Sequence, residues 1–448
     1  MAETHEGPSA FDHLDPPELE KILDCVHCGF CLPTCPTYLV LGNEMDSPRG
    51  RIYLMRSAAE GSVALTDSLV THLNLCLVCR ACETACPSGV QFGTLMEAAR
   101  GQVSRQYRYR TLDRLLRAFI LGTFTDRRRL LRLLRPMRFY QKLGIQRLVR
   151  ASGILGWFGR WGAMEALMPT LPAADLAEHF PDLTAAVPPR RGRVGLLLGC
   201  AQHAFFPDVN LATARVLSAN GFDVVAPREQ GCCGSLLIHE GERERGKALA
   251  RQTIEVFEAA QVDFVVVNAA GCGSAMKEYG ELLRSDPRFA ARAAAFSERV
   301  RDVSQLLATA GLRGSLKPLP LRVTYHDACH LAHGQRVRGE PRSLLKAIPG
   351  LDLVELTEAD FCCGSAGVYN LLHPEVAKEF LDRKLDRVAQ TGAQIVVSGN
   401  PGCLLQIAMG LRQRGLPIRA AHTVELLDFS YRGLVPEIPP GPPSGGSR

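Results

Sequence analysis

Several common cofactor and nucleophile motifs are missing from this sequence of 448 residues. It has no GxGxxG dinucleotide fingerprint, no phosphate-binding P-loop and no GxSxG nucleophile elbow. We therefore predict no flavin or nicotinamide site on this chain, and we name no catalytic residue. A two-electron oxidation that needs such a cofactor would have to take place on another protein.

Long apolar runs are also absent. No stretch reaches the roughly 18 apolar residues of a membrane-spanning helix, and Met1–Pro17 is polar and acidic, without the apolar segment of a signal peptide. We therefore expect the chain to remain in the cytoplasm, where thiols stay reduced. The formal net charge of +6 is small for this length, and without a nucleic-acid-binding motif it predicts no nucleic-acid partner.

Cysteine, in contrast, is abundant, and its spacing is informative. Eight of the 16 cysteines lie in two runs of identical spacing, each followed by proline: Cys25-x2-Cys28-x2-Cys31-x3-Cys35 and Cys76-x2-Cys79-x2-Cys82-x3-Cys86. This is the spacing of two-cluster bacterial ferredoxins, in which the fourth cysteine of each run binds the cluster of the other run.

We therefore predict two [4Fe–4S] clusters with crossed ligand sets. One set is Cys25, Cys28, Cys31 and Cys86, and the other is Cys76, Cys79, Cys82 and Cys35. The alternative for paired CxxC motifs is structural zinc. Zinc needs only four of these thiols and gives no reason for two identical runs, so we favour clusters.

The insert between the two runs contains the segment DSPRGR at positions 46–51. Ser47 followed by Pro48 predicts the start of a helix, with serine as the N-cap. In a functional interpretation, Arg49 and Arg51 stabilise the more negative charge of reduced clusters or dock a partner.

The other eight cysteines belong to an internal repeat. In the first copy Cys232 follows Cys200 by 32 positions and Cys272 follows Cys233 by 39; in the second, Cys362 follows Cys329 by 33 and Cys403 follows Cys363 by 40. Each copy alternates short apolar runs such as 264–270 with amphipathic segments such as 242–260, which predicts parallel α/β units. We expect the cysteines at the carboxyl ends of the strands, where sites of such sheets collect.

The expected fold class is therefore α+β with several domains. The segments are a mostly α-helical ferredoxin-type domain with two [4Fe–4S] clusters (1–100), an Arg-rich helical connector (101–188), a first α/β domain with the Cys-Cys-Gly (CCG) motif (189–316), a second CCG domain (317–435) and a disordered Pro/Gly/Ser tail (436–448).

The connector is strongly basic. From Arg100 to Arg150 there are 14 arginines and one lysine but only two acidic residues, Asp113 and Asp126, and leucine and phenylalanine are interspersed among them. Three interpretations remain open: solvated amphipathic helices between domains, a basic amphipathic face on anionic lipid, or docking to an acidic partner subunit.

Together these features resemble the iron–sulfur subunits of glycolate oxidases. The resemblance rests on DCVHCGFCLPTCPTY, DSPRGRIYLM and CRACETACPSGV, followed by the two CCG units, and it spans essentially the whole chain. It extends less closely to subunits of anaerobic glycerol-3-phosphate dehydrogenase, D-lactate dehydrogenases and heterodisulfide reductase.

The resemblance implies an electron-transfer subunit of an oxidoreductase complex. One or more partner flavoproteins would oxidise glycolate to glyoxylate, and this chain would pass the electrons to a quinone or another membrane acceptor. A peripheral contact with the inner face of the cell membrane would fit that role. A D-lactate or anaerobic glycerol-3-phosphate dehydrogenase is the alternative, because specificity in these families lies on the flavin-binding chain.

The CCG units depart from the heterodisulfide reductase pattern, which ends each unit with a further CxxC. Ala275 and Gln406 stand where the fifth cysteine would be. Four thiols could hold a further iron–sulfur cluster or zinc, pair as a disulfide between adjacent cysteines, or serve as small apolar side chains. His203, His326 and His330 are candidates for ligation or proton transfer. If the CCG units bound zinc, the C-terminal half of the chain would be an interaction module that carries no electrons.

Overall fold

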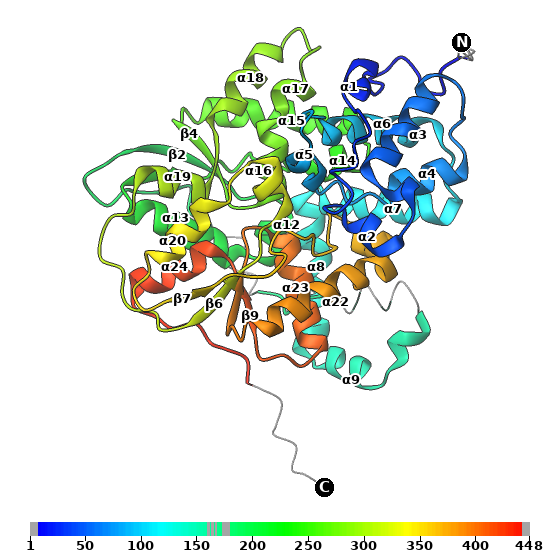
Figure 1. Cartoon of the computed structure of the whole chain (residues 1–448). Helices are drawn as coiled ribbons and strands as arrows, with labels where there is room; N and C mark the ends of the chain where they lie inside the picture. Colours follow the sequence, from blue (N-terminus) through cyan, green and yellow to red (C-terminus); the bar gives the residue numbers. More distant parts are fainter. Residues whose placement is uncertain (1–7, 159–161, 163–164, 166–167, 173–179, 441–448) are drawn as a thin grey trace.

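The computed structural model describes residues 8–158, 162, 165, 168–172 and 180–440, so the last eight positions of the expected tail lie outside the described residues. The N-terminal part is helical and lies beside the two sheets of the C-terminal half (Figure 1). Its helices are α1 (Leu19–Leu23), α2 (Pro36–Leu41), the 3₁₀-helix η1 (Glu44–Asp46), α3 (Pro48–Ala59), α4 (Asp67–Asn74), α5 (Ala81–Ala85) and α6 (Phe92–Gln106).

Helix α3 begins where the sequence predicts. The Oγ of Ser47 accepts a hydrogen bond from the backbone N–H of Gly50 at 3.0 Å, and Pro48 occupies the first helical position. At the other end of the N-terminal part, α6 continues past position 100, where we expected the first domain to end.

The connector forms α7 (Thr111–Phe124), α8 (Arg127–Lys142), α9 (Ile145–Ala151) and the 3₁₀-helix η2 (Ile154–Phe158). Leu130 and Leu134 of α8 are buried against Ala204 of the first α/β unit. Among the described residues, no helix combines the length and the apolar character needed to cross a membrane.

The first α/β unit has a five-stranded sheet of order β1-β3-β2-β4-β5, parallel except for the edge strand β1. Its elements are β1 (Leu183–Thr184), β2 (Gly192–Leu197), α12 (Ala201–Phe205), α13 (Pro207–Ala219), β3 (Phe222–Val225), α14 (Ser235–His239), α15 (Arg243–Ala259), β4 (Phe264–Val267), α16 (Ala270–Lys277), α17 (Tyr279–Leu282), α18 (Ala290–Arg299), β5 (Val300–Asp302) and α19 (Val303–Ala310).

The second unit repeats the parallel part of this topology in a four-stranded sheet of order β7-β6-β8-β9. Its elements are β6 (Arg322–Tyr325), the π-helix η3 (His330–Gly334), α20 (Gly339–Lys346), β7 (Asp352–Val354), α21 (Tyr369–Leu372), α22 (Pro374–Gln390), β8 (Ile395–Val397), α23 (Pro401–Gln413), β9 (Arg419–Ala421) and α24 (Thr423–Arg432). The predicted repeat of parallel α/β units is therefore confirmed.

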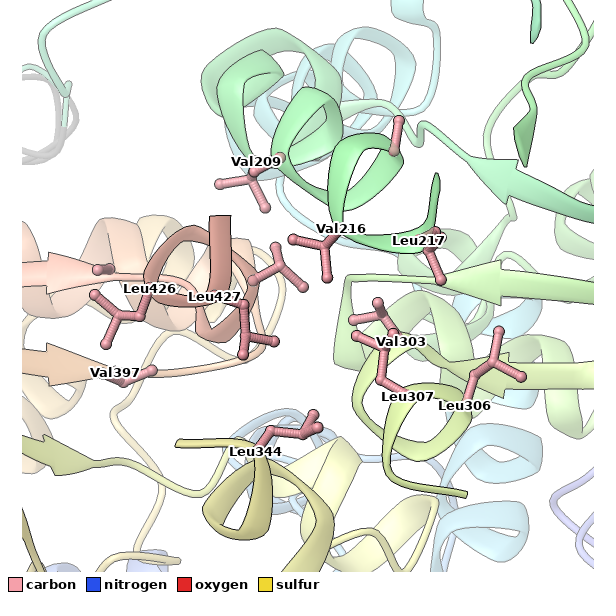
Figure 2. Close-up of a cluster of buried hydrophobic side chains, with 14 of the residues drawn as sticks. Val209, Val216, Leu217, Val303, Leu306, Leu307, Leu344, Val397, Leu426 and Leu427 are labelled. Atoms are coloured by element: carbon pink, nitrogen blue, oxygen red, sulfur yellow. The ribbon is translucent and has the colours of Figure 1, made fainter. Parts of the chain in front are cut away.

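The two units share one apolar core. Helix α13 packs against α24, and α19 packs against α20, so each unit contributes helices to the same buried layer (Figure 2). At the edge of this layer Arg215 of α13 forms a two-pronged ion pair with Asp428 of α24, at 2.7 and 2.8 Å.

The loops that follow β4 and β8 also meet. The backbone N–H of Ala270 donates to the carbonyl of Gly399 at 3.1 Å. His422, which follows the neighbouring strand β9, also reaches the loop after β4, since its Nε2 lies 2.9 Å from the carbonyl of Asn268. Both loops lie at the carboxyl ends of their strands, so the cysteine-bearing edges of the two sheets are held together.

The glycine of each CCG motif lies close to the backbone of a long helix that follows it in the chain, α15 in the first unit and α22 in the second. Gly234 and Gly364 have φ of +79° and +84°. A Cβ on Gly234 would lie 3.0 Å from the carbonyl oxygen of Gly246 in α15, and one on Gly364 would lie 2.6 Å from that of Ala377 in α22. The motif needs glycine because the chain must turn with positive φ and approach a helix backbone.

We predict that Gly364→Ala destabilises the protein by roughly 2–5 kcal/mol, because left-handed strain adds to overpacking. The control is Gly392→Ala, at φ +63° with no heavy atom within 4 Å of the added Cβ, which should cost only about 1–2 kcal/mol. Thermal melting of the two variants compares them, and equal melting temperatures would show that the close approach is unimportant.

Candidate iron–sulfur sites

The eight N-terminal cysteines lie around two adjacent cavities. One is lined by Cys25, Cys28, Cys31 and Cys86, the other by Cys35, Cys76 and Cys79, and Cys82 lines both. The fourth cysteine of each run thus lies with the first three of the other run. All 16 cysteines are within the described residues and none forms a disulfide, so the disulfide between adjacent cysteines is not formed here.

The two cysteine loops have the same backbone shape. His27 and Gly29 in the first loop and Val78 and Arg80 in the second all have positive φ. The strained Arg80 is held by ion pairs to Glu83 at 2.9 Å and to Glu278 of the first α/β unit at 2.5 Å. The turns aim backbone N–H groups at sulfur, as in the 3.3 Å contact from Val78 to Cys76 Sγ.

The two cavities differ in depth. Cys28 in the first is exposed, whereas all four cysteines that line the second are buried. Burial raises the pKa of Cys31 to about 11 and raises that of Cys79 well above its ordinary value. Such thiols need a cation to become the thiolates that bind iron. Grouped free thiols that face backbone donors therefore fit iron–sulfur clusters.

The two arginines of the insert lie beside these cavities. Arg51 is fully buried at the deeper one and donates to Thr37 Oγ1 at 3.0 Å, while its ion pair with Asp46 spans 3.2 Å. Arg49 lines the outer cavity and pairs with Glu44 at 2.6 Å. The helix-capping interpretation is confirmed, and the influence of the two positive charges on reduced clusters stays a prediction.

In the first α/β unit the four cysteines converge at the carboxyl edge of the sheet. Cys200 follows β2, the pair Cys232–Cys233 follows β3, and Cys272 lies in the first turn of α16. The Sγ atoms of Cys200 and Cys232 are 3.6 Å apart. The hydrogen bond to Cys232, together with burial, raises the pKa of Cys200 well above its ordinary value.

The second unit places Cys329, Cys362, Cys363 and Cys403 at the equivalent positions, all buried. Here histidines join the thiols: Nδ1 of His330 lies 3.4 Å from Cys329 Sγ, and His326 lies with Cys363 and Cys403. A hydrogen bond from Cys362, aided by His330, lowers the pKa of Cys329 well below its ordinary value. His203 of the first unit contacts Asn210 and Phe180.

The deeper N-terminal cavity adjoins the second unit. Cys79 belongs to the same buried cluster as Cys329 and Cys362. A 2.8 Å contact between Thr84 Oγ1 and His333 Nδ1 links α5 to η3 close by. The cysteine groups therefore form a row from the surface at Cys28 to the interior of the second unit.

Arg100 is a structural residue that sequence reasoning assigned to the basic surface stretch. It is 4% exposed in α6 and donates to the carbonyls of Asn74 at 3.1 Å, Cys76 at 2.6 Å and His239 at 2.8 Å. It ties the second cysteine loop to the first α/β unit. Its helical spacing from the buried Met96 and Val103 was the available indication of burial.

The fold and its cysteine-lined cavities define a two-cluster iron–sulfur protein joined to a pair of cysteine-rich α/β units. Comparison with family models agrees: residues 21–90 match a 4Fe-4S dicluster domain, residues 112–168 match the linker region of the glycolate oxidase iron-sulfur subunit, and residues 194–277 and 323–408 match a cysteine-rich domain.

Curated relatives resemble the chain over most of its length. It is 41% identical to a probable glycolate oxidase iron-sulfur subunit of Bacillus subtilis, over 91% of this chain and 93% of that protein. It is 34% identical to the glycolate oxidase iron-sulfur subunit of Escherichia coli, over 92% of this chain and 95% of that protein. It is 30% identical to a lactate utilization protein A of Exiguobacterium, over 52% of this chain and 96% of that protein. The chain belongs to the family of glycolate oxidase iron–sulfur subunits.

We propose the crossed ligand sets that the two cavities suggest, and single cysteine variants test them. Cys35→Ser should reduce the iron of the N-terminal domain from about eight to about four atoms per chain. It should also abolish the same electron paramagnetic resonance (EPR) signal as Cys79→Ser. Cys28→Ser, from the same run as Cys35, should abolish the other signal. If Cys35→Ser behaves like Cys28→Ser instead, the ligand sets are not crossed.

Proposed function

We propose that this chain is the electron-transfer subunit of a glycolate-oxidising complex, and that it passes electrons from a partner flavoprotein to a quinone or another membrane acceptor. The observation that carries the proposal is the row of cysteine groups from the exposed Cys28 to the buried second α/β unit. Such a row suits electron transfer between partners, whereas a single buried site does not. The substrate is inferred from the relatives, whose names specify glycolate oxidase.

In this function the chain binds the iron–sulfur clusters and shields them from solvent, and the partner flavoprotein oxidises the substrate. Iron–sulfur clusters supply one-electron redox states, with potentials set by charge, hydrogen bonds and solvent exposure. The residues around the deeper cavity exclude water, and Arg51 places a positive charge there. Sixteen unpaired thiols fit a reducing compartment, so we place the complex on the cytoplasmic side of the membrane.

The surface around the outer cavity is suited to docking the flavoprotein. Val26 and Phe30 in the first cysteine loop are 68% and 66% exposed, and Tyr53 of α3 is 62% exposed. Exposed aromatic side chains of this kind are typical anchors of protein interfaces. Val26 and Phe30 line the same cavity as Cys28, the most exposed of the cysteines, where the distance to a partner's flavin would be short.

Anaerobic mixing of the assembled complex with substrate tests the function. Glycolate should bleach the cluster absorbance of this chain, and D-lactate or glycerol 3-phosphate should do so far more slowly. Phe30→Asp should weaken flavoprotein binding roughly tenfold or more, since loss of an aromatic anchor costs about 2 kcal/mol. Val435→Asp, at a distant exposed position, is the control. Faster bleaching by D-lactate would assign the chain to the D-lactate alternative.

We also propose that the connector docks on anionic lipid, which would bring the chain to its membrane acceptor. Leu112, Leu115 and Phe119 are exposed on one face of α7, and Trp157 of η2 is 89% exposed. Exposed arginines such as Arg114 lie among them. Apolar side chains bordered by arginine are typical of helices that lie in a membrane interface.

Sedimentation of the full chain with vesicles tests this contact. We expect binding to vesicles of phosphatidylglycerol and phosphatidylcholine, weakening as salt increases, and little binding to phosphatidylcholine alone. Leu115→Asp combined with Phe119→Asp should remove it, whereas Leu434→Asp with Val435→Asp should not. If the chain binds neither vesicle, the lipid contact is wrong, and solvated helices between domains or docking to an acidic partner subunit are the interpretations left.

A further inference from the structure

The two ring nitrogens of His326 have different surroundings. It directly follows β6, is 1% exposed, and its backbone N–H donates to the carbonyl of Val397 at 2.8 Å. Its Nδ1 lies 3.1 Å from the carbonyl of Ala359. Because a carbonyl can only accept, Nδ1 carries the proton and donates it. Nε2 is buried and makes no hydrogen bond of ordinary geometry, and the side chain that interacts with the His326 ring is the thiol of Cys363.

The His326 ring belongs to a group of side chains that could bind a metal. One ring nitrogen of His326 and the Sγ atoms of Cys363 and Cys403 all lie within 4.8 Å of one another. Since Nδ1 is engaged by Ala359, Nε2 is the nitrogen available to this group. A histidine that binds a metal commonly donates its other ring N–H to a backbone carbonyl, which fixes the tautomer and the ring orientation. His326 has this arrangement.

We propose that His326 is a nitrogen ligand of an iron–sulfur centre in the second α/β unit, together with the thiolates of Cys329, Cys362, Cys363 and Cys403. This donor set has five members. Gln406 stands at the position of the fifth cysteine in the heterodisulfide reductase pattern and provides no thiolate there. The imidazole of His326 would supply a fifth donor instead.

The first unit has no counterpart to this nitrogen. Counting back three positions from the first cysteine of each unit gives His326 before Cys329 and Leu197 before Cys200. Leu197 is 2% exposed and packs in the apolar core. The two units therefore share a fold but offer different ligands, four thiols in the first and four thiols with an imidazole in the second.

Location favours iron over zinc. Cys329 and Cys362 lie in the same buried cluster as Cys79 of the deeper N-terminal cavity. A metal centre at this place can exchange electrons with a cluster in the deeper N-terminal cavity only if the centre is redox-active. Zinc is not redox-active. The choice of iron therefore rests on the proposed electron-transfer function, whereas ligation by His326 rests on the geometry alone.

Pulsed EPR of the anaerobically purified full chain tests the ligand without any mutation. Chain produced with unlabelled histidine should show ¹⁴N hyperfine coupling from an imidazole on one iron–sulfur signal, and chain produced with ¹⁵N-histidine should show the ¹⁵N pattern. His326→Gln should lose this coupling and shift the midpoint potential of that signal alone. The two N-terminal cluster signals should remain, which also shows that the variant folds.

A matched control is His422→Asn in the same unit. His422 is 1% exposed and follows β9 at the same sheet edge, but both of its ring nitrogens are engaged, by Asn268 O at 2.9 Å and by the N–H of Val424 at 3.2 Å. Asparagine is also a good helix N-cap. This variant should keep the nitrogen coupling.

Three outcomes would overturn the proposal. One is the absence of histidine nitrogen coupling in both the reduced and the oxidised wild-type chain. Another is an unchanged coupling and potential in His326→Gln. The third is zinc in the second unit, found as zinc that is lost in Cys363→Ala. None of these outcomes affects bleaching by glycolate, so failure of the ligand proposal and failure of the electron-transfer function can be told apart.

Discussion

The contact of α13 with α24 and of α19 with α20 determines how the two sheets face each other. These helices bury aliphatic side chains such as Val216, Leu307, Leu344 and Leu427 in one layer. Each fully buried side chain of this size contributes about 1.5–3 kcal/mol relative to exposure, far more than the partly exposed Arg215–Asp428 pair at the rim. With the layer in place, the loops after β4 and β8 meet, and the cysteines at the strand ends are brought to one side.

The helical N-terminal domain contacts the two units differently. To the first it is joined by polar contacts, through Arg80 with Glu278 and Arg100 with the carbonyl of His239. To the second it is joined through the buried cluster of Cys79 and Cys329, with the polar contact of Thr84 and His333 beside it. The repeat is symmetric in its topology, but its surroundings are not. The pKa values of the first cysteines differ for a more local reason, because Cys362 and the adjacent His330 lower the pKa of Cys329 in the second unit, whereas Cys232 and burial raise the pKa of Cys200 in the first.

Much of this arrangement can be predicted from the sequence, because it depends on local patterns. The helix start at Ser47, the strand within the apolar run 264–270 and the pairing of the CCG repeats all follow from caps, alternation and spacing. The role of Arg100 depends on which carbonyls a distant loop presents, and no local pattern reveals that. The environment of the His326 ring depends in turn on the carbonyl of Ala359 and on two thiols more than thirty positions away. Sequence spacing identifies such residues as candidates, and tertiary packing alone decides their partners.

The shared core has a consequence for how the two copies of the repeat can change. A substitution in α13 must be accommodated by α24 in the other copy, so the packing layer constrains both copies together. Leu197 and His326 lie at equivalent positions of the two units, and neither belongs to the shared layer, since Leu197 packs in the separate core of the first unit. A duplicated unit built in this way keeps its shape under mutual constraint while its ligands can vary independently. The fold thus allows two copies to diverge in chemistry without diverging in structure.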